Sequence, residues 1–174
     1  MVLAALASLG DKGKLGPQCR SEYVHDLERR LEVRFPESYR SFVLQVGDGG
    51  AGPGRGLWPL SRAARWADRG VYAPGYLATP FPFTARVPYE HFSELDDYGH
   101  HDDALTGSMI IGEIGTHTYF RLVVTGPARG QVWRDEVAAN GDLIPGLDFA
   151  DWYLNWLRRL GALKGSQTGR RRLV

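Results

Sequence analysis

The sequence predicts an α+β fold, with N-terminal helices packed on a mainly antiparallel sheet and a further helix at the C-terminal end. Three observations lead to this prediction. Apolar residues follow helical spacing in the first third, the pattern of strands joined by short turns appears in residues 109–134, and an aromatic helical segment comes last. Because alternating strand–helix units are missing, a doubly wound parallel sheet is not expected.

Two helices are expected after a short packed or frayed helix within residues 1–10. The first spans residues 21–32 and has Ser21 as a suitable N-cap. The second starts at Pro36, and Gly47 is expected to end it in a left-handed conformation. Apolar residues recur at helical spacing in both, at Val24, Leu27, Leu31, Tyr39, Phe42, Val43 and Val46.

The middle of the chain is the least regular part. The glycine-rich segment 47–56 must turn sharply, and residues 56–60 resemble a short edge strand because Pro59 cannot occupy a central strand. Residues 62–105 follow no regular period. Since so long a loop is unusual within a compact domain, we expect a short helix or strand inside it.

The last third of the chain carries the sheet and a helix. Three segments have the residues typical of strands: 109–114, 118–125 and 131–134. Residues 126–130 predict a hairpin turn, and Asn140 with Gly141 predicts another. Asp148 is expected to N-cap a helix that Gly161 ends. The predicted buried face of this helix carries Phe149, Trp152, Tyr153, Trp156, Leu157 and Leu160.

The chain is expected to form one domain, residues 1–161, followed by a disordered basic tail, residues 162–174. From Arg158 onward there are six basic and no acidic residues, which leaves 15 basic against 20 acidic residues before it. The single cysteine, Cys19, excludes an internal disulfide and favours a reducing, cytoplasmic compartment. No segment has the composition of a membrane helix or a secretory signal.

Residues 86–103 are the most acidic part of the chain, with six acids and one arginine. Opposite charge speeds the encounter of two proteins, so a basic protein partner is expected here and nucleic acid is not. Aromatic side chains usually supply the anchors of such an interface. The hypothesis places partner binding at Trp58, Tyr89, Glu90, Phe92, Glu94, Asp96, Asp97, Tyr98, Asp102 and Asp103. The oligomeric state stays open.

Three patterns could indicate chemistry. Residues 47–52 match the glycines of a dinucleotide-binding loop, but they follow a helix and lead into Pro53, whereas such a loop follows a strand. The histidines and aspartates of residues 91–103 could hold a metal, although a solvated acidic loop is favoured. Cys19 shows no positioned base or oxyanion site. No cofactor or metal is therefore expected, and an enzyme or metal-binding protein is the least favoured hypothesis.

Separate segments of the chain together resemble one family, the SUKH superfamily or Smi/Knr-like group. The resemblance rests on residues 31–42, 46–57, 105–107, 111–116, 122–133 and 149–157, in this order. The most specific element is the helix signature Leu-Pro-x-x-Tyr, in which Phe35 replaces the usual leucine before Pro36, and Tyr39 matches. The glycine-rich turn with Trp58 and the segment 62–105 depart from the shortest members.

The resemblance implies a SUKH-like α+β fold and a non-enzymatic protein. Bacterial members are commonly immunity proteins, which bind and block a toxin domain, often a nuclease or a deaminase. Eukaryotic members act as interaction scaffolds. The first hypothesis is therefore toxin neutralisation by direct binding, with the acidic segment 86–103 meeting a basic toxin domain. The alternative is a general protein-interaction module in bacterial signalling or cell-envelope regulation.

Overall fold

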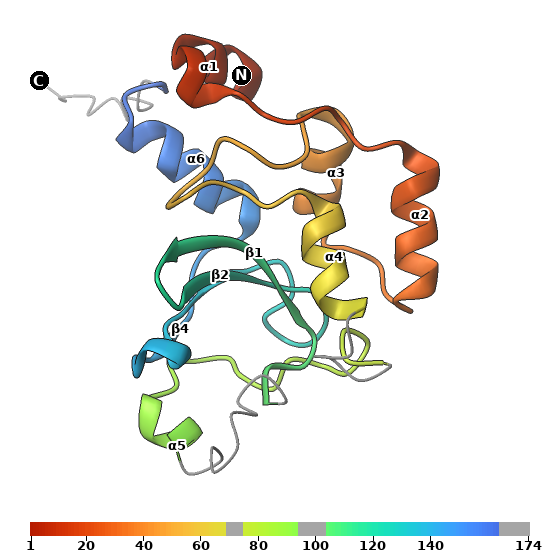
Figure 1. Cartoon of the computed structure of the whole chain (residues 1–174), viewed down its shortest axis with the longest axis vertical. Coiled ribbons are helices and arrows are strands. Elements are labelled where there is room, and N and C mark those ends of the chain that lie inside the picture. Colours follow the sequence, from red (N-terminus) through yellow and green to blue (C-terminus); the bar gives the residue numbers. More distant parts are fainter. Residues whose placement is uncertain (69–74, 94–103, 164–174) are drawn as a thin grey trace, which may run out of the picture.

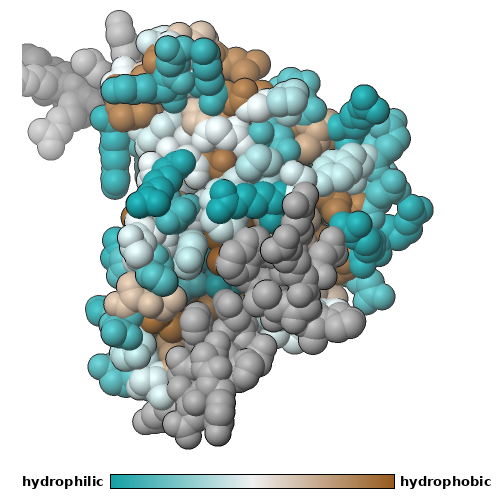
Figure 2. Space-filling model, viewed as in Figure 1, coloured by the Kyte–Doolittle hydropathy of each residue, from teal (hydrophilic) through white to brown (hydrophobic). Residues whose placement is uncertain are grey.

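The computed structural model describes residues 1–68, 75–93 and 104–163, with the backbone alone for residues 65–68. Helices lie on one side of an antiparallel sheet, and an irregular segment with one short helix lies on the other (Figure 1). The predicted α+β fold is confirmed. Among the described residues on the face shown in Figure 2, hydrophilic side chains are interspersed with residues of intermediate hydropathy and with smaller hydrophobic patches. No helix in the described ranges has the length and apolar character needed to cross a bilayer.

The helices follow the predicted order, with additions in the middle of the chain. The described α-helices are α1 (Val2–Ser8), α2 (Ser21–Arg30), α3 (Glu37–Gln45), α4 (Leu60–Asp68), α5 (Tyr89–Ser93) and α6 (Phe149–Arg159). Two short 3-10 helices are η1 (Gly10–Gly13) and η3 (Val137–Ala139). Helices α4 and α5 confirm that the irregular segment 62–105 contains regular structure.

The sheet contains four strands, and strands that follow one another in sequence are adjacent in the sheet. The strands are β1 (Ser108–Gly115), β2 (Thr118–Val123), β3 (Val132–Asp135) and β4 (Leu143–Ile144), in the order β1-β2-β3-β4. All three pairings are antiparallel. The three predicted strands appear as β1, β2 and β3, because short turns join each strand to the next.

The sheet is buried on both faces because successive strand residues point to opposite sides. On β2, Leu122 belongs to a large core formed with the helices, whereas Val123 belongs to a second core on the other face. The second core is completed by residues of the irregular segment and of α5, namely Phe81, Val87 and Phe92. The segment that contains the predicted acidic surface thus also covers one face of the sheet.

Helix α6 matches its prediction at both ends. The Asp148 side chain accepts a hydrogen bond from the backbone N–H of Ala150 (2.9 Å), which satisfies an otherwise unpaired donor of the first turn. Gly161 follows the helix with φ of 72°, the left-handed conformation that glycine adopts without strain. The Tyr153 hydroxyl donates to the carbonyl of Ala51 (2.9 Å), so α6 is tied to the glycine-rich segment.

Three local predictions differ from the structure. Ser21 is the first residue of α2, and the N-cap is Arg20, which makes no side-chain capping bond. Pro36 is the N-cap of α3 rather than its first residue. Gly47 does not have a positive φ; instead a Cβ there would lie 2.8 Å from the carbonyl oxygen of Gly16. Close packing against the preceding chain, and not a left-handed cap, requires this glycine.

Residues 56–60 meet the β1 edge of the sheet, as an edge strand would, but only through isolated contacts. Leu57 forms one antiparallel bridge with Gly112, and the N–H of Trp58 donates to the carbonyl of Ile111 (2.8 Å). Helix α4 begins directly afterwards at Leu60. Because Pro59 has no N–H to donate, the pairing does not extend into a strand.

The start of the predicted tail is packed rather than free. Ala162 and Leu163 are half-buried and pack against the large core. The N–H of Ala162 donates to the carbonyl of Leu157 (3.0 Å) and so continues the end of α6. The remaining residues of the predicted tail, 164–174, lie outside the described residues.

Candidate protein-binding groove

The predicted acidic surface begins at α5, whose position is set by Asp142. One oxygen of the Asp142 carboxylate accepts a bond from the Tyr89 N–H (3.0 Å), and the other accepts from Arg86 Nε (2.6 Å). The Arg86 hydrogen bond, followed by the Tyr89 backbone bond, lowers the pKa of Asp142. The first turn of α5 is therefore held against the loop before β4, with Glu90 exposed.

Of the other predicted binding residues, two are buried and six lie outside the part of the chain that the structure describes. Phe92 is only 1% exposed and is part of the second core, so its side chain cannot act as a surface anchor. Trp58 is also buried, and the Arg62 guanidinium lies 3.7 Å above its ring. Six predicted residues lie outside the described residues: Glu94, Asp96, Asp97, Tyr98, Asp102 and Asp103.

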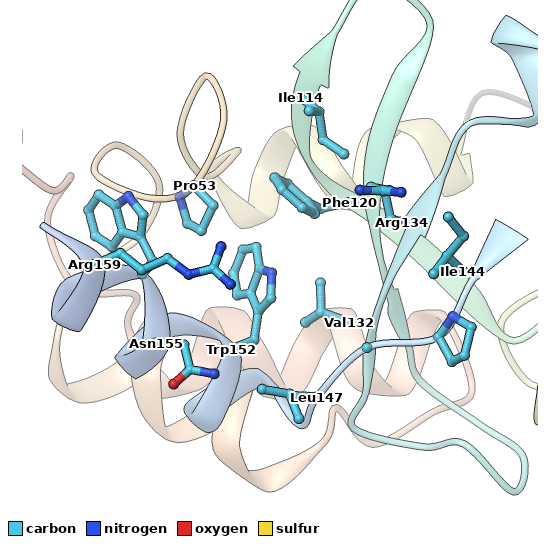
Figure 3. Close-up of a pocket in the computed structure, with 13 residues that line it drawn as sticks. Pro53, Ile114, Phe120, Val132, Arg134, Ile144, Leu147, Trp152, Asn155 and Arg159 are labelled. Carbon is cyan, nitrogen blue, oxygen red and sulfur yellow. The ribbon is translucent and has the colours of Figure 1, made fainter. Parts of the chain in front are cut away.

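A different feature stands out as a binding surface: a groove of about 450 Å³ between α6 and the sheet (Figure 3). We call it the α6 groove. Its apolar walls are formed mainly by Pro53, Ile114, Phe120, Val132, Ile144, Leu147, Trp152 and Trp156. Its polar side chains are Arg134, Asn155 and Arg159. The groove is thus assembled from the glycine-rich segment, all four strands, the loop after β4 and the last helix.

Strand alternation explains which residues of β3 reach the groove. Val132 and Arg134 line it, whereas Trp133 belongs to the second core and Asp135 is buried. Residues two apart on a strand share a face. A shift of β3 by one residue would therefore turn Trp133 and Asp135 toward the groove and Val132 and Arg134 away from it. On β2, Phe120 lines the groove on the same face of the sheet as the helix-side core residue Leu122.

The aromatic residues of the groove are held by contacts with one another. The Phe120 and Trp152 rings meet edge to face, with centroids 4.9 Å apart. Trp156 packs on Tyr153, with centroids 5.2 Å apart. Trp152 and Trp156 are four residues apart on α6 and therefore lie on one side of it. Both are half-buried, so part of each ring faces the groove.

The charged residues of the groove are all basic. Arg134 and Arg159 line it, and no acidic residue is among the residues of the described chain that do so. Figure 3 shows the two arginines on opposite sides of the groove, with Trp152 and Val132 between them. Arg134 is partly neutralised by Glu136, whose Oε1 lies 3.0 Å from Arg134 Nε. The arrangement favours a ligand with apolar surface and negative charge.

Cys19 is unsuited to act as a nucleophile. Burial, then the charge of Asp48 and a hydrogen bond to its carboxylate, raises the pKa of the thiol from 9.0 to about 12. The same burial and charge raise the pKa of the neighbouring Tyr39 hydroxyl. Because the thiolate is the reactive form of cysteine, this environment suppresses reactivity.

The remaining candidate patterns also have structural explanations in the described residues. A Cβ on Gly50 would lie 2.5 Å from the carbonyl oxygen of Lys14, so glycine lets the two segments touch. His91 is exposed on α5, and its ring packs edge to face on Phe83 with centroids 5.7 Å apart. No group of three or more metal-binding side chains occurs in the described part of the chain, and the aspartates near His91 lie beyond it.

Comparison with known proteins places the fold and most of the groove in one family. A model of the SMI1 / KNR4 family (SUKH-1) matches residues 18–155. The chain belongs to this family. No curated protein and no solved structure matches the chain significantly. Most residues of the α6 groove lie within the segment that matches the SMI1 / KNR4 family, whereas Trp156 and Arg159 follow it.

Sequence reasoning missed the α6 groove because it assigned Trp152 and Trp156 to the core face of the last helix. The six apolar residues of that face have the spacing of the usual apolar stripe of a surface helix. In the structure Phe149, Tyr153 and Leu157 are buried, while the two tryptophans line the groove. The sequence therefore carried no signal that separates the half-buried tryptophans from the buried residues of this face.

Proposed function

We propose that this protein is a non-enzymatic protein-binding domain of the immunity type, which neutralises a nuclease or deaminase toxin by direct binding. The observation that carries the proposal is the α6 groove, an open surface with two half-buried tryptophans. Membership of the SMI1 / KNR4 family supports it, since proteins of this family are generally non-catalytic.

The groove has the features of a protein-recognition site. Tryptophan and arginine are the side chains most enriched among residues that dominate binding energy, and the groove combines two of each. Side chains already fixed by packing lose little conformational freedom on binding. The contact of Trp152 with Phe120 fixes one of the tryptophans in this way.

The acidic segment 86–103 is proposed as a second contact, with a basic region of the toxin. Glu90 and the partly exposed Tyr89 lie at its described end, held in place by Asp142. Exposed carboxylates at the rim of an interface act mainly on the association rate, because they steer the two proteins before contact. This proposal concerns a basic toxin domain and does not extend to nucleic acid.

The test of the proposed function is a neutralisation assay. The chain would be co-expressed in a bacterial host with nuclease and deaminase toxin domains encoded beside its gene, and survival would be counted. We expect survival to rise with one toxin, and the purified pair to form a complex in size-exclusion chromatography. Survival without a complex would contradict direct binding. Failure with every neighbouring toxin would overturn the immunity role and favour the general interaction module.

The acidic contact has its own test once the toxin is known. Reversing Asp96, Asp97, Asp102 and Asp103 to lysine should slow association and reduce its salt dependence, because exposed charges act over roughly 8–10 Å. Stopped-flow association at two salt concentrations measures this. If the quadruple variant binds at the wild-type rate at both concentrations, the acidic segment is not part of the interface.

A further inference from the structure

We propose that the α6 groove takes a short acidic segment of a partner protein, which seats an aromatic or aliphatic side chain against Trp152 and places carboxylates near Arg134 and Arg159. The inference rests on the proposed function, because it assumes that the groove binds protein. It adds the chemistry of the occupant: this occupant is acidic, whereas the region of the partner expected to contact the acidic segment 86–103 is basic.

The apolar part of the occupant follows from the shape and composition of the groove. Its volume, about 450 Å³, lies within the range of roughly 300–1,000 Å³ typical of small-molecule pockets, so it has room for a large side chain. Phe120, Trp152 and Leu147 surround its middle, as Figure 3 shows, and Leu147 is 47% exposed. A large apolar side chain placed there would remove this surface from water, which is the main favourable contribution to such binding.

The charge of the occupant follows from the two arginines on either side of Trp152. Both are exposed, and no ion pair joins Arg159 to any residue within the described ranges. Arg134 contacts Glu136 through Nε. A guanidinium has several donors in a planar fork, so carboxylates of a partner can still pair with each arginine. A basic occupant would instead bring like charges together at both sides.

The same charge argument disfavours the chain's own C-terminal residues as the occupant. Residues 164–174 contain Lys164, Arg170, Arg171 and Arg172 and no acidic residue. They follow directly after Leu163, which packs against the core next to α6. Their sequence carries the same sign of charge as the groove, and the occupant is therefore assigned to another protein.

The test uses a random twelve-residue peptide library displayed on phage and selected against the immobilised full chain. Enriched peptides would be synthesised with a fluorescein label, and their dissociation constants measured by fluorescence anisotropy. We expect them to combine acidic residues with at least one aromatic or large aliphatic residue. Selection of basic or uncharged peptides, or no enrichment, would overturn the inference.

Matched variants decide whether such peptides occupy the groove. Arg134→Gln combined with Arg159→Gln should weaken binding about tenfold, because two charge-assisted contacts are lost. The control, Lys12→Gln combined with Arg20→Gln, removes the same charge at exposed positions outside the groove and should leave binding unchanged. Trp152→Ala should weaken binding at least tenfold, with thermal melting to confirm folding. Equal effects of both double variants would show a general charge effect and contradict the proposed site.

Two further outcomes distinguish this inference from the proposed function. If the Arg134→Gln and Arg159→Gln variant still neutralises the toxin at the wild-type level, the groove inference fails and the immunity role stands. If acidic peptides bind the groove but no neighbouring toxin is neutralised, the groove inference stands and the immunity role fails. A third outcome is that the chain associates with itself and that Arg134→Gln with Arg159→Gln abolishes this association. That would assign the groove to a second copy and overturn the inference.

Discussion

At the scale of single residues, the sheet contains one fully buried ion pair. The carboxylate of Asp135 accepts bonds from Arg121 Nη2 (2.7 Å) and Nε (3.0 Å), and the side chains are 3% and 1% exposed. The second carboxylate oxygen accepts the backbone N–H of Val137 (3.2 Å). The desolvation of two charges offsets most of their attraction, so the pair adds little stability itself, but neither partner is stable there alone.

Removing one partner of this pair should therefore be costly. We expect Arg121→Met to lower the free energy of unfolding by about 3–5 kcal/mol, because Asp135 then remains buried without its counter-charge. Urea unfolding measures the loss. The double variant Arg121→Met with Asp135→Leu should lose less than the single one. A single variant within about 1 kcal/mol of wild type would mean that water reaches the pair.

The chemistry of Cys19 makes a second prediction at this scale. With its pKa raised from 9.0 to about 12, the thiol of the folded protein holds very little thiolate at pH 8.5. Alkylation by iodoacetamide should be at least about a hundredfold slower than in urea, and its rate should rise steadily with pH. Asp48→Asn removes the nearby charge and should speed the reaction. Equal rates in folded and unfolded protein would show that Cys19 is freely exposed.

The raised pKa of Cys19 also determines how the stability of the protein depends on pH. Because the folded-state pKa of Cys19 lies above the unfolded one, its contribution to stability is complete below about pH 9 and is lost as pH rises towards 12. Buried Tyr39, whose pKa is also raised, acts in the same direction at higher pH. Both groups therefore contribute to unfolding in alkali and not in acid.

At the scale of elements, α6 contributes on two adjacent sides to the large core and to the α6 groove. One side carries Tyr153 and Leu157, which are buried in the large core. The adjacent side carries Trp152 and Trp156, which pack against the same core and also line the α6 groove. Because the same helix packs on the core and lines the groove, its packing fixes the position of the groove residues.

The two sides of α6 should respond differently to truncation. Leu157 has no exposed surface, so Leu157→Ala should cost about 2–5 kcal/mol of unfolding free energy. The sequence alone predicts about 3–5 kcal/mol for Trp156→Ala if that site is fully buried, but Trp156 is half-buried, so we expect less than about 2 kcal/mol. Urea unfolding compares them. A greater loss for Trp156→Ala than for Leu157→Ala would contradict the assignment of the two sides.

At the scale of the whole molecule, the two cores share one sheet, and the last described residues pack against the larger of them. Helices α3 and α6 cover one face, and the segment from Phe81 to Phe92 contributes to the cover on the other. Leu163 is the last described residue and packs against the larger core. The packing on the larger core therefore includes the residues directly after α6.

Truncation at two positions should locate the C-terminal end of the folded domain. Deleting residues 164–174 should change the melting temperature by less than about 1 °C, because this basic segment has no apolar periodicity. Deleting residues 162–174 also removes the packing of Ala162 and Leu163 and should lower the melting temperature by about 2–4 °C. Calorimetry measures both. A large loss from the shorter deletion would show that residues 164–174 bind the folded part.

The sequence by itself determined the order and type of most elements. Helical spacing placed α2 and α3, strand residues placed β1 to β3, and Asp148 with Gly161 placed both ends of α6. These predictions rest on interactions between residues close in sequence, such as capping bonds and hydrogen-bonded turns. Such interactions are specified by the local residues, whatever the rest of the chain does.

Only the tertiary structure decided which large side chains are buried and which are available. Phe92 and Trp58 were expected at a surface and are buried, whereas Trp152 and Trp156 were expected in the core and are only half-buried against it, so that they also line a groove. Burial depends on which distant segments pack on a residue. Pro53, Phe120 and Trp152 form one groove although they are far apart in the chain. Periodicity indicates that a face is apolar, but not how much of that face its neighbours cover.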